Sequence, residues 1–223
     1  MHFEDRIEAA KQLVPKLEKY KNATATYILA IPRGSLEMGY ELSKTLHLPL
    51  DIVVTRKIPA PGNEEYAIGS VAPDGGTLLN EEAVRGYGIS PEYINNEKDR
   101  LLVEIKRRYK MYRAPADNNI IPSFTGKTVI IIDDGIATGF TMKAAISYLR
   151  REKVKKIVVA VPVAAPDTAK EIADMVDEFI CLSTPMFFAA VGQFYENFPQ
   201  VSDEEAANFL KKAADLFKTS QKP

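Results

Sequence analysis

The feature that most constrains the fold is the stretch VIIIDDGIATGFT at residues 129–141. Its first four residues are apolar and β-branched, which is typical of a strand buried on both faces in the centre of a parallel sheet. Asp133 and Asp134 follow directly, so we expect them at the carboxyl end of that strand. Ligands of open α/β sheets bind at this end, and both aspartates are therefore candidate ligand-binding residues.

The rest of the chain repeats this organisation. Short apolar runs alternate with amphipathic stretches, which predicts an α/β fold with a mostly parallel central sheet and helices on both faces. Strands are expected at residues 27–31, 51–55, 128–132, 157–163 and 179–182, and helices at 35–46, 141–151 and 167–176. Apolar spacing over residues 3–17 indicates an N-terminal helix, although Pro15 interrupts it. Ser202 and Glu205 form a capping-box pattern that predicts a C-terminal helix.

Residues 57–125 are expected to form an insertion, because they separate two core strands by more than a crossover helix needs. The first part, residues 59–76, is rich in proline and glycine. A helix is predicted to begin at Ser90 and Pro91 and to bury one apolar face. Such insertions commonly serve as lids or as accessory packing elements.

Composition limits the classes of partner. The chain has 29 Lys and Arg against 30 Asp and Glu, so nothing in its charge favours nucleic acid or an anionic membrane. No apolar run approaches membrane-spanning length, and no secretory leader is visible. The single cysteine, Cys181, lies in an apolar stretch where we expect core packing, and its isolation fits the reducing cytoplasm. His2 and His47 have no clustered partners, so a histidine metal site is not supported.

Residues 135–141 are predicted to bind a phosphate group. They lead into a helix whose first turn has unpaired N–H groups and a positive dipole end. Small residues let a phosphate approach this backbone, and the hydroxyls of Thr138 and Thr141 can add hydrogen bonds. The segment is neither a Walker A loop nor a GxGxxG dinucleotide loop.

The two aspartates suit the hydroxyl groups of a sugar, because ionised carboxylates only accept hydrogen bonds. A ribose 5-phosphate would place its phosphate in the loop and its 2- and 3-hydroxyls near Asp133 and Asp134. The simpler alternative is a strand-end turn whose acids cap the following helix.

Residues 129–141 closely resemble the thirteen-residue ribose-phosphate signature of the type I phosphoribosyltransferases. This resemblance implies a single phosphoribosyltransferase domain over residues 1–223, with a lid insertion at 57–125. It also implies a small hood and terminal helices at residues 1–20 and 183–223. Residues 61–69 resemble the family's mobile catalytic loop, in the form found in a branch whose acceptor is not established.

The resemblance implies roles for individual residues. Asp133, Asp134 and Lys57 would be catalytic, and both aspartates would contact Mg²⁺, directly or through water. The magnesium would arrive with the substrate 5-phosphoribosyl 1-diphosphate. The residues that would bind this donor are Arg33 and Gly34 of a pyrophosphate loop that often contains a cis peptide, Arg56 at the end of the second core strand, and Gly135, Ile136, Ala137, Thr138, Gly139, Phe140 and Thr141.

The implied reaction transfers ribose 5-phosphate to a nitrogen acceptor, expected to be a nucleobase, and releases pyrophosphate. The partners would be small molecules, in a cytoplasmic enzyme that forms a homodimer. Purines, pyrimidines and other amines all remain open as acceptors, and an aromatic ring among Phe187, Phe188, Phe194 and Tyr195 could stack on a flat base or pack in the core. The alternative function is a non-catalytic sensor of phosphoribosyl diphosphate or nucleotides on the same fold. The basic and aromatic run at residues 107–113 is expected to be a solvated helix end rather than a nucleic-acid site.

Overall fold

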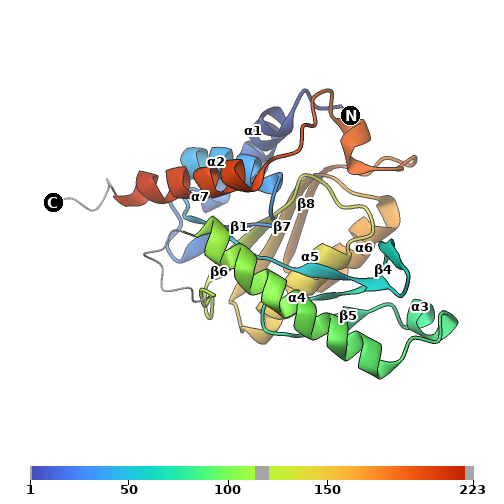
Figure 1. The fold of residues 1–223 in the computed structure, drawn as a ribbon. Coiled ribbons are helices and arrows are strands. Elements are labelled where there is room, and N and C mark those ends of the chain that lie inside the picture. Colours follow the sequence, from blue (N-terminus) through green and yellow to red (C-terminus); the bar gives the residue numbers. More distant parts are fainter. Residues whose placement is uncertain (1, 114–120, 219–223) are drawn as a thin grey trace.

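The computed structural model describes residues 2–113 and 121–218 (Figure 1). Within this part of the chain, the central sheet has five parallel strands in the order β2-β1-β6-β7-β8. The strands are β1 (Thr26–Ala30), β2 (Leu50–Ile52), β6 (Thr128–Ile132), β7 (Lys156–Val163) and β8 (Glu178–Ser183). Ile132 pairs with Ala30 on one side and with Ala160 on the other, so β1 and β6 end at the same level, whereas β7 continues to Val163. The mostly parallel α/β fold expected from the sequence is confirmed.

Alternating side chains of the sheet face two helical layers. Ile28, Ile130 and Val158 belong to the core beneath α1 (Arg6–Leu17) and α2 (Ser35–Leu46). Their neighbours Leu29, Ile131 and Val159 belong to the core beneath α5 (Phe140–Arg151) and α6 (Pro166–Met175). All six side chains are fully buried, as required for strands that are apolar at every position.

The terminal helices lie where the sequence predicts them. Helix α1 continues through Pro15, and α7 (Asp203–Lys218) packs against α2. Ser202 and Glu205 form the predicted capping box, in which each backbone N–H donates to the other residue's side chain. Two short 3-10 helices, η1 (Glu18–Tyr20) and η2 (Val191–Phe194), lie after α1 and before α7.

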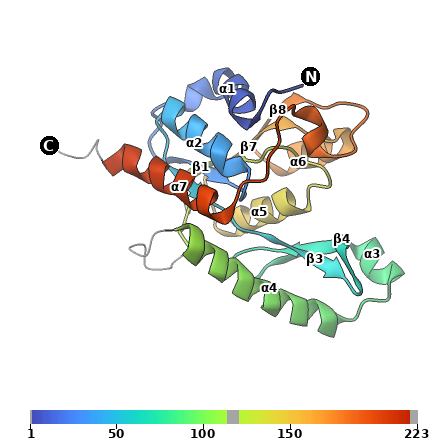
Figure 2. The same ribbon diagram turned by 45° about the horizontal axis from the view of Figure 1, so that its top comes forward.

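The insertion contains a second sheet beside the core (Figure 2). Strands β3 (Arg56–Ala60), β4 (Asn63–Val71) and β5 (Thr77–Leu79) are antiparallel and lie between α4 (Pro91–Tyr112) and α5, and α3 (Glu81–Gly86) follows β5. Ser90 caps α4 as predicted, since its side chain accepts a hydrogen bond from the Tyr93 N–H. The expected insertion and C-terminal segment include residues 114–120 and 219–223, which lie outside the described part of the chain.

The expected strand at residues 51–55 was wrong at its carboxyl end. β2 stops at Ile52, because the pairing with its single neighbour β1 ends at Ala30, whose carbonyl accepts a last hydrogen bond from the Val53 N–H. Arg56 and Lys57 therefore do not end a core strand but open β3 of the second sheet. The second sheet was not predicted, because prolines are unusual in paired strands. Pro59 lies at an irregularity of the β3–β4 pairing, where a residue without an N–H is tolerated.

The described residues include no helix with the length and apolar character that a membrane crossing needs. Cys181 is partly buried, its thiol lies 3.1 Å from the Ser183 carbonyl oxygen, and burial raises its pKa.

Candidate functional site

The loop between β6 and α5 is held in place from the neighbouring strand and helix. Ile136 accepts a backbone hydrogen bond from Ala165 and donates one to Val163, as an extension of the sheet. The hydroxyl of Thr168 on α6 donates to the Ala137 carbonyl at 2.7 Å. Gly139 has a positive φ of 73° and directly precedes α5. The loop is therefore a preformed turn at a helix N-terminus, which is a favourable environment for an anion.

This loop surrounds a cavity of about 210 Å³ at the carboxyl end of β6. Asp133 and every residue from 135 to 141 line the cavity, together with Lys57 from β3 and Val191 from η2. The structure thus brings together most of the residues predicted for donor binding. Asp134 does not line this cavity.

Asp134 is instead paired with Arg6, the first residue of α1. The Arg6 Nε lies 3.0 Å from the Asp134 Oδ2, and the arginine side chain is only 5% exposed. Its Nη1 donates to the Pro199 carbonyl at 2.8 Å, and its guanidinium lies 3.9 Å from the centre of the Phe198 ring. The Tyr195 hydroxyl donates to the Asp134 backbone carbonyl. Arg6 thereby ties the second acid of the motif to the segment before α7.

Sequence reasoning missed Arg6. The one available signal was its position in the first turn of a predicted helix, where a cation opposes the helix dipole and needs another partner. The partner lies 128 residues away in the chain, so no local pattern identifies it.

The two aspartates have different electrostatic environments. Burial raises the pKa of Asp133, and the adjacent charge of Asp134 raises it further. Burial also raises the pKa of Asp134, but the Arg6 guanidinium opposes this change. Asp133 is therefore the acid whose ionised form would gain more from a hydroxyl donor or a cation in the cavity.

The predicted pyrophosphate loop approaches the acids closely. The Pro32–Arg33 peptide bond is cis, as the family resemblance implied, and the Ser35 hydroxyl donates to the Ile31 carbonyl. A Cβ on Gly34 would lie 2.5 Å from the Asp134 Oδ2, so any larger residue would collide with the Arg6–Asp134 pair. Arg33 lines neither of the two described cavities, and its Nη1 lies 3.5 Å from Asp203 at the start of α7.

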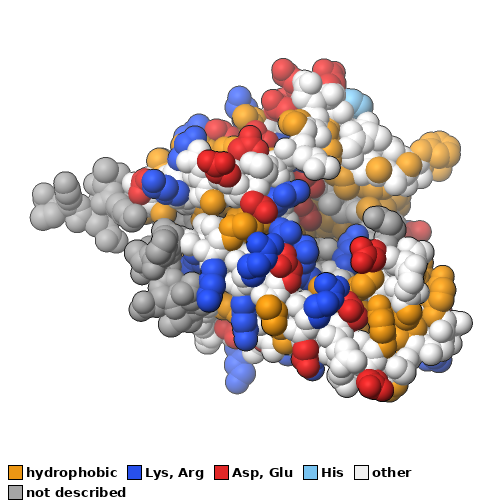
Figure 3. Space-filling view, viewed as in Figure 1, with side chains coloured by type: hydrophobic (Ala, Val, Ile, Leu, Met, Phe, Trp, Pro, Cys, Tyr) orange, Lys and Arg blue, Asp and Glu red, His pale blue; other side chains and the backbone are white. Residues whose placement is uncertain are grey.

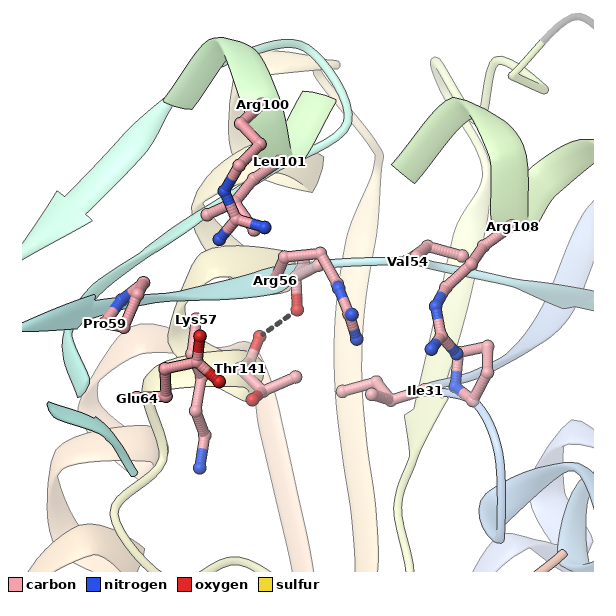
Figure 4. A pocket seen from close by; sticks show the side chains of 12 residues that line it. Ile31, Val54, Arg56, Lys57, Pro59, Glu64, Arg100, Leu101, Arg108 and Thr141 are labelled. Atoms are coloured by element: carbon pink, nitrogen blue, oxygen red, sulfur yellow. Dashed lines mark hydrogen bonds between the residues drawn. The ribbon is translucent and has the colours of Figure 1, made fainter. Parts of the chain in front are cut away.

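A second cavity, of about 420 Å³, adjoins the first and shares Lys57 and Thr141 with it (Figure 4). It lies between β3, α4 and the start of the pyrophosphate loop. Arg56 lines this second cavity and not the first.

Comparison with known proteins identifies the family. Residues 4–198 match the model of the phosphoribosyl transferase domain. The chain belongs to the phosphoribosyl transferase family. A protein of Mycobacterium tuberculosis named "Putative phosphoribosyl transferase Rv0571c" is 39% identical over 211 residues, which cover 95% of this chain and 47% of that protein. A protein from a second strain, "Putative phosphoribosyl transferase MT0597", gives the same values, so the chain spans about half the length of these relatives.

A solved structure is similar over nearly the whole chain. It is the crystal structure of TT1426 from Thermus thermophilus, with a TM-score of 0.76 and 35% sequence identity. The similarity covers 94% of this chain and 98% of that protein. The predicted family and fold are therefore confirmed together.

The aromatic residues before α7 divide into packed and exposed rings. Phe194 and Tyr195 are buried, and Phe188 packs against Phe194 with ring centres 5.0 Å apart. Phe187 is 87% exposed. Among the four predicted rings, Phe187 is thus the most exposed in this member of the phosphoribosyl transferase family.

Proposed function

We propose that this protein transfers ribose 5-phosphate from 5-phosphoribosyl 1-diphosphate to a nitrogen acceptor and releases pyrophosphate. The observation that carries the proposal is the single cavity that joins Asp133, the loop of residues 135–141 and Lys57. An anion-binding loop, a carboxylate and a cation at one site match the three parts of this donor, which are its 5-phosphate, its ribose and its diphosphate.

The donor would lie across the carboxyl end of β6. Its 5-phosphate would accept hydrogen bonds from the first turn of α5 and from the hydroxyls of Thr138 and Thr141. Its ribose hydroxyls would donate hydrogen bonds to Asp133. Asp134 would not contact the ribose, but its ion pair with Arg6 would hold the turn in place. Lys57, Arg56, Arg33 and Gly34 would surround the diphosphate.

In the proposed reaction, a bond forms between the acceptor nitrogen and C1 as the bond from C1 to the diphosphate oxygen breaks. Positive charge develops on the ribose, and the Asp133 carboxylate would stabilise it. The departing diphosphate takes the bonding electrons, and Lys57 would stabilise its added negative charge. Closure of residues 59–76 over the cavity would exclude water, which would otherwise capture the sugar.

The residues at this site fit magnesium that is carried by the donor. Among the described residues, no group of three or more His, Cys, Asp or Glu side chains could hold a metal ion. Magnesium generally combines one or two carboxylates with water and substrate phosphates, and Asp133 could supply such a carboxylate, directly or through water. When bound, the ion would supply positive charge at the diphosphate. Asp134 could contact the magnesium only through an oxygen atom that does not accept a hydrogen bond from Arg6.

The acceptor is proposed to be a nucleobase, because the exposed ring of Phe187 could stack on a flat heterocycle. We further propose a cytoplasmic role in nucleotide metabolism and a homodimeric state.

The function is tested by measuring pyrophosphate release with phosphoribosyl diphosphate, magnesium and a panel of purines, pyrimidines and other amines. We expect release that depends on one acceptor class. The double variant Asp133→Asn, Asp134→Asn should lose at least about a hundredfold of this activity, because the carboxylate charge at the ribose is removed. Circular dichroism and thermal unfolding would check that this variant is folded.

A fully active double variant would contradict the proposed mechanism. Tight donor binding without release for any acceptor would instead favour the alternative function, a sensor of phosphoribosyl diphosphate or nucleotides.

A further inference from the structure

The loop between β8 and η2, residues 184–190, exposes two large apolar side chains that are neighbours in the sequence. Met186 is 88% exposed and Phe187 is 87% exposed. In the space-filling view, hydrophobic side chains protrude at the edge of the molecule, at the place where Figure 1 draws this loop in orange (Figure 3). Adjoining exposed apolar side chains commonly mark a contact with a ligand or a partner.

The loop is closed by one side chain, that of Gln193. Its Oε1 accepts hydrogen bonds from the backbone N–H groups of Ala189 and Ala190, at 3.0 and 3.2 Å. Its Nε2 donates to the Phe187 carbonyl at 3.1 Å. We call these three hydrogen bonds the Gln193 clamp. Both ends of the amide group are thus used to fix the backbone around Phe187.

The clamp fixes the backbone of Phe187 while its ring stays exposed. The next residue, Phe188, instead packs against Phe194 and the core. A fixed backbone limits an aromatic side chain to a few staggered χ1 positions. The Phe187 ring is therefore presented to solvent with little freedom, which lowers the entropy cost of binding a ligand.

The loop is joined to the smaller cavity through Val191. This residue directly follows the loop and lines the cavity. It also packs on the phosphate loop, since a Cβ on Gly135 would lie 2.6 Å from the Val191 Cγ1. Four residues span at most about 14 Å of extended chain, so the backbone of Phe187 lies within that distance of Val191. The loop thus continues one wall of the proposed donor site toward solvent.

The same segment has no charged side chain to offer a ligand. Residues 184–193 read TPMFFAAVGQ and include no Asp, Glu, Lys, Arg or His. Its contact with an acceptor would come from apolar and aromatic surface, which suits a flat heterocycle. Stacked rings interact over a limited range of centre-to-centre distances, so the position of the Phe187 backbone matters for such a contact.

We propose that Gln193 is a positioning residue for the acceptor. Its clamp holds the Phe187 ring where this ring stacks on the base that accepts the ribose, and Gln193 itself does not touch the base. The inference rests on the proposed function for the place of the donor and for the stacking on Phe187. It adds the residue on which this stacking depends.

Isothermal titration of ribose 5-phosphate and of nucleoside 5′-monophosphates tests the proposal. Ribose 5-phosphate carries the sugar and phosphate alone, whereas the monophosphates of adenosine, inosine, guanosine and uridine add a base at C1. We expect at least one monophosphate to bind about tenfold more tightly than ribose 5-phosphate, because its base stacks on Phe187. Phe187→Ala should remove most of this difference and leave the affinity for ribose 5-phosphate unchanged within about twofold.

Gln193→Met keeps the length of the side chain but removes the clamp. We expect it to bind the same monophosphate about fivefold more weakly, because the ring must then be ordered on binding. Its affinity for ribose 5-phosphate should stay within about twofold of the wild type. Added to Phe187→Ala, Gln193→Met should have no further effect, since both act through one ring. The clamp is exposed to water, so the variant should fold, and thermal unfolding would check this.

Gln200→Met is the matched control. Gln200 is another exposed glutamine before α7, and it lies outside the 184–190 loop and the clamp. This variant should bind every ligand as the wild type does. Gln193→Glu keeps acceptor atoms for the Ala189 and Ala190 N–H groups but loses the donor to the Phe187 carbonyl. Its affinity for the monophosphate should therefore lie between those of the wild type and Gln193→Met.

Digestion with chymotrypsin, which cleaves after aromatic residues, reports on the clamp in the absence of ligand. Gln193→Met should speed cleavage after Phe187, because the released loop adapts more readily to the protease. Cleavage after Tyr87, which is 61% exposed on another part of the chain, should keep its rate. An unchanged rate after Phe187 would show that the clamp does not fix the loop and would overturn the proposal.

Three binding results would also overturn it. Equal losses for ribose 5-phosphate and the monophosphate in Gln193→Met would show that Gln193 supports the whole site rather than the base. Additive losses in the double variant would show that Gln193 does not act through Phe187. If no monophosphate binds more tightly than ribose 5-phosphate, the exposed ring serves another contact, such as a protein partner.

The titrations need no turnover, which separates this inference from the proposed function. The expected affinities without pyrophosphate release from any acceptor would contradict the proposed transfer and support the role of Gln193. Pyrophosphate release with a normal acceptor KM in Gln193→Met would support the transfer and contradict that role.

Discussion

Asp133 and Asp134 are neighbours in the chain, yet the structure gives them different partners. Asp133 lines the smaller cavity, whereas the Asp134 side chain accepts a hydrogen bond from the buried Arg6. Two chemically identical neighbours therefore lie in different environments, because one side chain faces the cavity and the other meets Arg6 of α1. We infer that Asp133 contacts the substrate and that Asp134 acts as a positioning residue through Arg6 and the segment before α7.

Removal of Arg6 should therefore be costly to stability. Arg6→Gln leaves Asp134 buried without its cation, and we expect the free energy of unfolding to fall by about 3 kcal/mol. Asp134→Asn in the same chain should recover part of this loss, since no unpaired buried charge then remains. Urea unfolding of the two single variants and the double variant measures the coupling. Strictly additive losses would contradict a direct Arg6–Asp134 interaction.

At the scale of elements, the second sheet is attached to the core at one end. Asp74, in the turn between β4 and β5, forms two hydrogen bonds with Arg151 of α5, at 2.6 and 2.9 Å. The Ser70 hydroxyl donates to the Phe140 carbonyl at the start of α5. The opposite end, residues 61–64 at the turn from β3 into the start of β4, is exposed. Movement of the predicted lid at residues 59–76 should therefore be confined to this exposed end.

Limited proteolysis tests the lid. A protease of broad specificity should cut first within residues 61–66, and phosphoribosyl diphosphate with magnesium should slow that cut, because exposed loop ends are cleaved most readily and ligand favours the closed state. Arg151→Ala should expose an additional site near residues 72–76. Arg150→Ala, which removes a pairing with Asp177 instead, is the control. Digestion that is unchanged by ligand, or that begins at the Asp74 turn in the wild type, would count against the lid.

At the scale of the whole molecule, the site and an ionic cluster around Glu178 lie at opposite ends of the central sheet. Glu178, at the start of β8, accepts hydrogen bonds from Tyr20 at 2.6 Å and from Lys156 at 2.9 Å, and it lies 2.7 Å from Lys19. This cluster joins η1, which follows α1, to the amino ends of β7 and β8. It can therefore affect stability without contacting the substrate.

The cluster predicts a loss of stability in acid. Burial raises the pKa of Glu178, but hydrogen bonds from Lys19, Tyr20 and Lys156 lower it to about 2, against an ordinary value of 4.5. A lowered pKa in the folded state stabilises the protein above pH 4.5, and this contribution disappears as the pH falls from 4.5 toward 2. Because the cluster is partly hydrated, we expect Glu178→Gln to cost about 1 kcal/mol at pH 7.

Urea unfolding from about pH 7 down to about pH 2.5 provides the measurement. The difference between wild type and Glu178→Gln should shrink as the pH falls below 4.5, and pyrophosphate release at neutral pH should not change. Asp167→Asn, at a side chain that is 95% exposed, should show no such dependence. A constant difference across the whole range would show that Glu178 acts by packing rather than by charge.

The sequence by itself determined the features that depend on consecutive residues. The buried strand β6, the acids at its end and the loop that opens α5 lie within residues 129–141, so their pattern predicted both the local structure and its chemistry. The core helices could also be predicted, because an amphipathic face is a local signal. The second sheet could not be predicted in this way, because its prolines are unusual in strands. Its strands are stabilised by pairing with one another and by packing against α5.

Only the tertiary structure decided which distant charges meet. Arg6 reaches Asp134 from the other end of the chain, and α4 brings Arg100 and Arg108 to Arg56 across the insertion. Lys57 reaches the phosphate loop because β3 packs against α5, not because a core strand ends there. Ion pairs and cavities depend on where whole elements pack, and a linear pattern of residue types carries little information about that placement.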